Sequence, residues 1–142
     1  MKEFNLLDKA LLLKDSLLFH ELDLDLLLAI AYKMDLLHYT KDQFIFSEGQ
    51  EALSIYLIVQ GKISILNANL HPITNLKTGD FFGDESIFNQ KKRAYSAKSH
   101  STSILLSLGS HDLFEIIKEC PQIAIKLLNN YTDNLSFRQV IP

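Results

Sequence analysis

The sequence predicts a mainly β fold with flanking α-helices: an antiparallel β-roll, similar to a jelly roll, that lies between helical segments in the chain. Apolar residues recur at helical spacing near both ends, and short segments rich in β-branched and aromatic residues alternate with turn residues between them. Because 142 residues suit one core, we expect a single domain over residues 1–142. Its parts are expected to be N-terminal helices at 1–40, the β-roll at 41–108 and C-terminal helices at 109–142.

Residues 4–39 are expected to be helical. Their apolar residues recur at spacings of three and four, first over residues 6–13 and again over residues 22–34. Asp23 is expected to cap the second helix, because a carboxylate accepts hydrogen bonds from the N–H groups at a helix start. We expect the recurring leucines to form the faces that pack against the core.

Four segments in the middle of the chain are expected to be strands: FIF, IYLIV, KISIL and SILLSL. Turn residues at 47–50, 60–61, 67–69 and 77–80 separate them. Strands this short and this evenly spaced are typical of a small antiparallel barrel or jelly roll.

The C-terminal part is expected to return to helix. Gly109 or Ser110 can cap a segment that carries Leu113 and Ile116. Pro121 can open a last helix, because proline is tolerated in a first helical turn.

Charge and composition narrow the function. The formal net charge is −3 and the isoelectric point is about 5.9, which argues against nucleic acid as the main partner. No segment has the unbroken apolar length of a signal peptide or a membrane span. The single cysteine, Cys120, allows no internal disulfide. We therefore expect a cytoplasmic protein without a membrane segment.

The sequence offers no metal or catalytic constellation. The five histidines are scattered and contain no H-x-H pair of the kind that cupin barrels use. No nucleophile and base can be paired from their spacing. We therefore expect a protein that is not an enzyme and holds no metal.

Residues 78–97, TGDFFGDESIFNQKKRAYSA, combine features that suit an anion. Gly83 precedes a short segment, residues 84–88, that is expected to form one helical turn. The free N–H groups of a helix start attract anions, and a glycine lets the backbone approach them closely. Arg93 adds a planar fork of donors that fits a phosphate, and the carboxylate beside Gly83 can accept from ribose hydroxyls. This is the chemistry of a cyclic nucleotide site.

The order of the motifs resembles the cyclic nucleotide-binding domain shared by catabolite activator protein, the protein kinase A regulatory subunits and cyclic nucleotide-gated channels. An F-x-E-G element occupies residues 46–49 and is followed by Tyr-Leu-Ile at 56–58 and by Gly61. G-D-F-F-G at 79–83 and R-A-x-S at 93–96 complete the set. The resemblance covers nearly the whole chain.

The resemblance implies roles for individual residues. Arg93 and the backbone of Gly83, Glu85 and Ser86 would bind the cyclic phosphate, and Asp84 would accept from the ribose 2′-hydroxyl. Ala94 favours cyclic AMP over cyclic GMP, since a threonine at that position often accompanies cyclic GMP. The complete expected ligand site is Phe82, Gly83, Asp84, Glu85, Ser86, Arg93, Ala94, Tyr95, Ile65 and Ile73, of which the two isoleucines would face the base.

Two residues depart from the family pattern. Asp84 replaces the usual glutamate and is one methylene shorter, which withdraws the carboxylate by up to about 1.5 Å and weakens the ribose contact without abolishing it. Tyr95 stands where the family usually has a small residue. If its ring points inward, it competes with the ligand for volume at a cost of about 1–3 kcal/mol. Alternation from Arg93 places Tyr95 inward, whereas a β-bulge would turn it outward, so both orientations remain open.

Two functions therefore remain open. The first is a non-enzymatic sensor that binds cyclic AMP or cyclic GMP in the β-roll and signals through movement of the C-terminal helices. The alternative is a degenerate domain that binds no nucleotide and acts as a protein-interaction or dimerisation module, forming a homodimer or binding an effector protein through its C-terminal helix. The few residues after Tyr131 leave no room for a helix-turn-helix, so we expect a stand-alone domain or a fragment of a larger protein.

Overall fold

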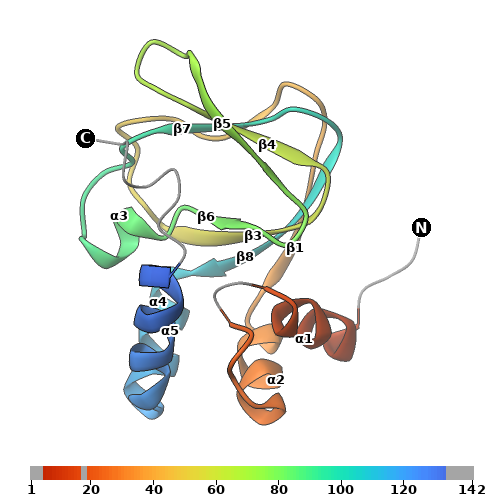
Figure 1. Ribbon diagram of the computed structural model, residues 1–142, viewed down its shortest axis with the longest axis vertical. Coiled ribbons are helices and arrows are strands. Elements are labelled where there is room, and N and C mark those ends of the chain that lie inside the picture. Colours follow the sequence, from red (N-terminus) through yellow and green to blue (C-terminus); the bar gives the residue numbers. More distant parts are fainter. Residues whose placement is uncertain (1–4, 17–18, 134–142) are drawn as a thin grey trace.

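Two antiparallel sheets face each other and form a β-roll, and helices lie below one of them (Figure 1). The computed structural model describes residues 5–16 and 19–133 of the chain. The mainly β architecture with flanking helices agrees with the expectation from the sequence.

The two N-terminal helices begin at capped residues. In α1 (Leu6–Lys14) the Asn5 side chain accepts from the Asp8 N–H at 2.8 Å, while the Asn5 N–H donates to the Asp8 carboxylate at 3.2 Å. In α2 (Leu24–Tyr32) the Asp23 carboxylate accepts from the Leu26 N–H at 3.4 Å, as predicted. Both helices are thus placed by short polar residues immediately before their leucines.

The first sheet has the strand order β1-β8-β3-β6. Its strands are β1 (Asp35–Tyr39), β3 (Ser54–Gln60), β6 (Phe81–Phe82) and β8 (Ser103–Gly109). The prediction of helix for residues 35–39 was wrong: all five pair with β8, from Asp35 opposite Ser107 to Tyr39 opposite Ser103. The run is too short for its period to separate strand from helix, and pairing with a distant strand decides its conformation.

The second sheet has the order β2-β7-β4-β5. It contains β2 (Phe44–Phe46), β4 (Lys62–Leu66), β5 (Pro72–Lys77) and β7 (Ser96–Ser99). β7 begins later than the sequence suggested, because Arg93 and the two residues after it belong to the preceding loop. A bulge lies in the β4–β5 pair between Ile65 and Leu66.

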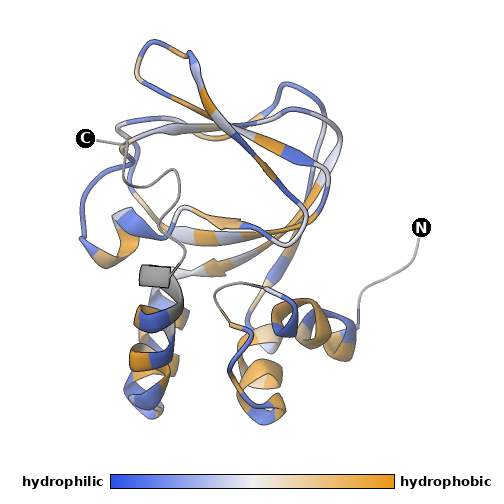
Figure 2. Ribbon diagram, in the orientation of Figure 1, coloured by the Kyte–Doolittle hydropathy of each residue, from blue (hydrophilic) through white to orange (hydrophobic). Residues whose placement is uncertain are grey.

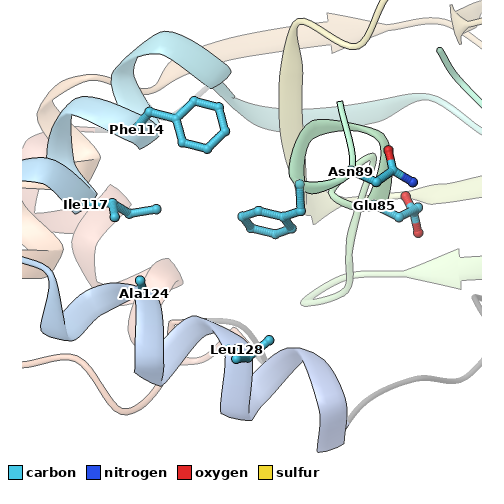
Figure 3. Close-up of a pocket in the computed structure, with 7 residues that line it drawn as sticks. Glu85, Asn89, Phe114, Ile117, Ala124 and Leu128 are labelled. Atoms are coloured by element: carbon cyan, nitrogen blue, oxygen red, sulfur yellow. The ribbon is translucent and has the colours of Figure 1, made fainter. Parts of the chain in front are cut away.

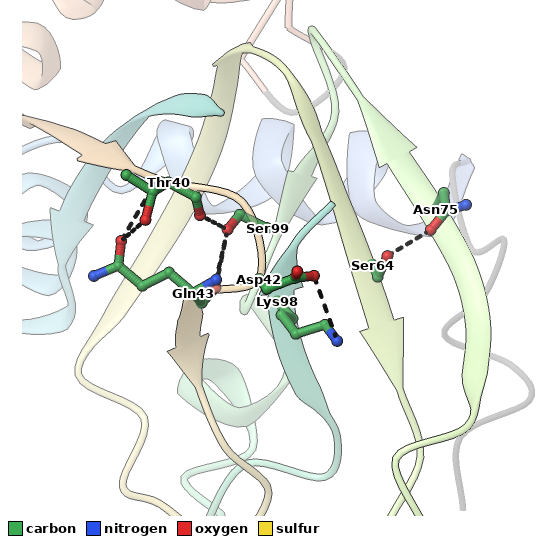
Figure 4. A network of polar contacts seen from close by, with 7 residues as sticks. All are labelled: Thr40, Asp42, Gln43, Ser64, Asn75, Lys98 and Ser99. Carbon is green, nitrogen blue, oxygen red and sulfur yellow. Dashed lines mark hydrogen bonds and ion pairs between the residues drawn. The ribbon is translucent and has the colours of Figure 1, made fainter. Parts of the chain in front are cut away.

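A polar network fastens the turn between β1 and β2 to the second sheet (Figure 4). The buried Ser99 hydroxyl accepts from the Gln43 N–H at 3.1 Å and bonds to the Thr40 carbonyl. Lys98 and Asp42 form an exposed ion pair at 3.9 Å, which adds little stability. The buried serine therefore matches backbone groups that would otherwise lose their partners in this corner.

The first sheet is buried on both faces. Leu57 and Leu106 pack against the helices, while their chain neighbours Ile58 and Leu105 point into the roll. Alternate residues of one strand thus serve two cores, which is why β3 and β8 read as continuous apolar runs.

The C-terminal helices α4 (Ser110–Glu119) and α5 (Gln122–Asp133) also lie below the first sheet (Figure 1). Gly109 is the N-cap of α4, one of the two predicted candidates, and Leu113 and Ile116 enter the core between the sheet and the helices. Their other faces are polar, as the hydropathy colouring shows (Figure 2). Within the described residues, no helix is long and apolar enough to cross a membrane.

Glycine is required at the β3–β4 turn. Gly61 has φ +101°, and a Cβ there would lie 2.7 Å from the Thr102 carbonyl oxygen. We expect Gly61→Ala to lower the free energy of unfolding by about 1–3 kcal/mol beyond the cost of the backbone angle. Gly49→Ala is the matched control, because Gly49 has a similar φ of +86° and open space around it. Urea unfolding that gave both variants equal losses would contradict the role of the close approach.

Candidate functional site

The candidate site lies where β6 ends and α3 (Glu85–Phe88) begins, at one end of the roll (Figure 1). The predicted single helical turn is present here. Gly83, between the two elements, has φ +83° and is packed so closely that a Cβ would lie 2.9 Å from Nη1 of Arg93 and 3.3 Å from the Ser54 carbonyl oxygen. A glycine is therefore needed both for the backbone angle and for the approach of the arginine.

Arg93 is buried and is held by neutral acceptors. The residue is only 3% exposed, and its Nη1 and Nη2 donate to the Gly83 and Ser54 carbonyls, each at 2.6 Å. Its guanidinium carbon lies 4.0 Å from the centroid of the Phe46 ring. Among the described residues it forms no ion pair, and its Nε has no hydrogen-bond partner. Burial lowers the pKa of Arg93, and the nearby phenols and carboxylates oppose that change.

Tyr95 points into the roll, which settles the orientation that the sequence left open. The residue is 1% exposed, and its hydroxyl accepts from the Gly83 N–H at 2.9 Å and donates to Oε1 of Glu85 at 2.7 Å. The Gly83 N–H is one of the donors that the family resemblance assigns to a phosphate. In this structure the protein's own phenol occupies that donor.

Aromatic rings fill the space beside this bond. Phe46 lies with its ring centroid 5.5 Å from Tyr95, 5.9 Å from Phe82 and 6.0 Å from Tyr56. Phe82 and Tyr56 stack at 5.2 Å. Phe46 and Tyr56 were not predicted as site residues, although both belong to motifs that indicated the fold. Only the packing of four strands shows that they surround Arg93.

The remaining predicted residues separate into two groups. Asp84 is fully buried, and Ile65, Ile73 and Ala94 belong to or pack against the core inside the roll. Ser86 is buried too, but its hydroxyl donates to the Lys92 carbonyl at 3.2 Å and thus closes the loop after α3. The roll interior therefore collects most of the expected site, and the Ser86 side chain stabilises its rim.

An apolar groove of about 530 Å³ lies beside the site, between α3 and the two C-terminal helices (Figure 3). Glu85 and Asn89 line it from the side of α3, and Phe114, Ile117 and Leu128 from the other side. Glu85 therefore accepts from Tyr95 on one side and faces this groove on the other. The arrangement joins the roll interior to the helices through one carboxylate.

The site has the groups for binding and none that indicates metal chemistry. In the described ranges, 5–16 and 19–133, no three His, Cys, Asp or Glu side chains come close enough to hold a metal ion. What the residues offer is a buried cation, a backbone N–H at a glycine and apolar walls. Such a set binds an anionic, partly apolar molecule.

Sequence comparison identifies relatives with this arrangement. The profile of the cyclic nucleotide-binding domain matches residues 36–120. The cyclic AMP receptor protein of Thermus thermophilus is 30% identical over 122 residues, which cover 81% of this chain and 55% of that protein. One of the polypeptides of the cyclic nucleotide-gated cation channel of Drosophila melanogaster is 25% identical over 117 residues, covering 78% of this chain and 18% of the channel polypeptide. The chain thus spans about half, or less, of these relatives.

Solved structures share the fold. The sensor domain of the transcriptional regulator DNR from Pseudomonas aeruginosa superposes with a TM-score of 0.76 at 19% identity, over 92% of this chain and 96% of that domain. Catabolite activator protein of Thermus thermophilus superposes with a TM-score of 0.74 at 27% identity, over 84% of this chain and 58% of that protein.

The buried phenol makes stability depend on alkaline pH. Burial, followed by the nearby Glu85 and Asp84 charges, raises the pKa of Tyr95 well above its usual value of 10.0. The unfolded chain therefore loses this proton first, so the stability is complete below about pH 10 and is lost as the pH rises further, by up to about 1.4 kcal/mol per pH unit. Burial also raises the pKa of Tyr39 and Tyr56, which act in the same direction.

We expect Tyr95→Phe to remove its share of this slope in urea unfolding measured at about pH 9 to 11. Tyr39→Phe serves as the control for a phenol outside the site. An unchanged slope in Tyr95→Phe would show that Tyr95 ionises equally in the folded and unfolded chains.

Proposed function

Because this chain belongs to the cyclic nucleotide-binding domain family, we propose that it is a non-enzymatic regulatory domain that binds a cyclic nucleotide inside its β-roll. Cyclic AMP is the preferred ligand, since the residue after Arg93 is alanine. The bound nucleotide changes the position of the C-terminal helices, and a partner of the domain responds to that change.

The buried Arg93 is the observation that carries this proposal. A guanidinium removed from water costs much free energy unless an anion accompanies it. Among the described residues, Arg93 has two carbonyls, an aromatic ring and no carboxylate within ion-pair distance. A cyclic phosphate supplies the missing negative charge, and charge-assisted bonds to it are stronger than the bonds to neutral carbonyls.

The other contacts follow from the same placement. The phosphate takes the N–H groups at the start of α3, including that of Gly83, and Asp84 accepts from the ribose. The apolar side chains of Ile65 and Ile73 cover one side of the base. The nucleotide shifts α4 and α5 only to the extent that it binds one arrangement of these helices better than the other.

Binding calorimetry with cyclic AMP and cyclic GMP tests this function. We expect saturable binding, stronger for cyclic AMP, and a loss of ten-fold or more in Arg93→Ala, because each lost charge-assisted bond is worth about 1.5–3 kcal/mol. Lys92→Ala is the matched control: it removes an exposed charge one residue away. Equal losses in the two variants, or unchanged affinity in a folded Arg93→Ala, would contradict the assigned site.

A second candidate function is favoured by the Tyr95 hydroxyl on the Gly83 N–H. It is a nucleotide-free interaction module that associates through the C-terminal helix, where Ile125 and Leu128 are 64% and 61% exposed. An exposed apolar face on a helix favours association with another apolar surface.

This second candidate predicts that the wild-type chain self-associates without nucleotide and that Leu128→Asp dissociates it. Sedimentation velocity measures both, with Gln122→Asp at the start of the same helix as the control. A wild-type monomer, or a Leu128→Asp variant that stays associated, would count against this module.

A further inference from the structure

The Tyr95 side chain occupies the backbone donor that a ligand phosphate needs. We infer that Tyr95 is an internal occupant of the phosphate site, so that a cyclic nucleotide binds only the form in which the Tyr95 hydroxyl has left Gly83. This inference rests on the function proposed above and adds its regulation. It requires the wild-type domain to bind more weakly than its Arg93 and Gly83 geometry alone allows.

The competition follows from hydrogen-bond capacity. The Gly83 N–H is a single donor, and the Tyr95 hydroxyl already accepts from it at 2.9 Å. A phosphate oxygen that took this donor would have to lie in the volume of the buried hydroxyl. The two acceptors therefore exclude each other.

Several contacts hold Tyr95 in the closed form. Its hydroxyl donates to Glu85 at 2.7 Å, its ring lies 5.5 Å from that of Phe46, and the residue is almost completely buried. A ligand must displace all of these contacts together. Because only the open fraction can bind, the apparent dissociation constant exceeds the intrinsic one by the inverse of that fraction.

The same bond connects the site to the C-terminal helices. Glu85 accepts the Tyr95 hydroxyl and also lines the groove whose other side consists of Phe114 from α4 and Leu128 from α5 (Figure 3). When Tyr95 leaves, this donor to Glu85 is lost, and the carboxylate changes its environment at the edge of the groove. Tyr95 and Glu85 are thus the two-state element that both the roll interior and the helices can bias.

The decisive experiment compares cyclic AMP binding by the full chain carrying Tyr95→Phe or Tyr95→Ala with that of the wild type. Tyr95→Phe keeps the ring and removes the competing hydroxyl, so we expect roughly ten-fold tighter binding. Tyr95→Ala also removes the ring, so its gain should be at least as large. Since Tyr95→Ala leaves a cavity in the core, a melting curve must accompany it, and Tyr95→Phe remains decisive if the alanine variant unfolds.

The controls separate this inference from the proposed function. Tyr39→Phe removes a hydroxyl from another tyrosine of the roll and should leave the affinity unchanged. Adding Arg93→Ala to Tyr95→Phe should abolish the gain, because the released site still needs its cation. A wild type without measurable binding beside a Tyr95→Phe that binds through Arg93 would support the inference in its strongest form.

Two outcomes overturn it in different ways. If the wild type binds cyclic AMP and folded Tyr95→Phe binds equally or more weakly, the internal occupant is wrong while the proposed function stands. If the wild type and both folded Tyr95 variants fail to bind cyclic AMP and cyclic GMP, the proposed function fails, and the inference fails with it.

Discussion

A buried guanidinium without an anionic partner among the described residues organises this end of the β-roll. The Arg93 side chain bonds to the Gly83 and Ser54 carbonyls, and its backbone N–H and carbonyl pair with Gln50 and Gly49, each at 2.8 Å. One residue thereby joins the turn after β2, the start of β3 and the segment between β6 and α3. The rest of the site depends on this placement, because a buried cation requires all of its surroundings to be polar acceptors, aromatic faces or anions.

Tyr95 shows how the protein satisfies this site by itself. A backbone N–H at the start of α3 has to be matched once it is buried, and in this structure the phenol matches it while Glu85 accepts the phenol's own proton. The pocket and its substitute ligand therefore belong to one chain. A small side chain at this position would leave both the volume and the donor to a visiting molecule.

The first sheet transmits any such change, because it belongs to both cores. Its inner residues, such as Ile58 and Leu105, surround the aromatic cluster, while Leu57 and Leu106 touch the helices. Close-packed layers of this kind transmit displacements of their neighbours. Glu85 offers a second and more direct route, from the Tyr95 hydroxyl to the groove beside α4 and α5.

The sequence by itself determined the β-roll between helices, the turns at its glycines, the caps at Asp23 and Gly109, and the short helix that follows Gly83. These features depend on local periodicity and local hydrogen bonding, which neighbouring residues encode. The tertiary structure alone decided that residues 35–39 form a strand, that Tyr95 points inward, and that Phe46 and Tyr56 surround Arg93. The side chain of Tyr95 needed the position of Glu85, ten residues away, and the ring of Phe46 needed β7, far along the chain, so no local pattern contained them.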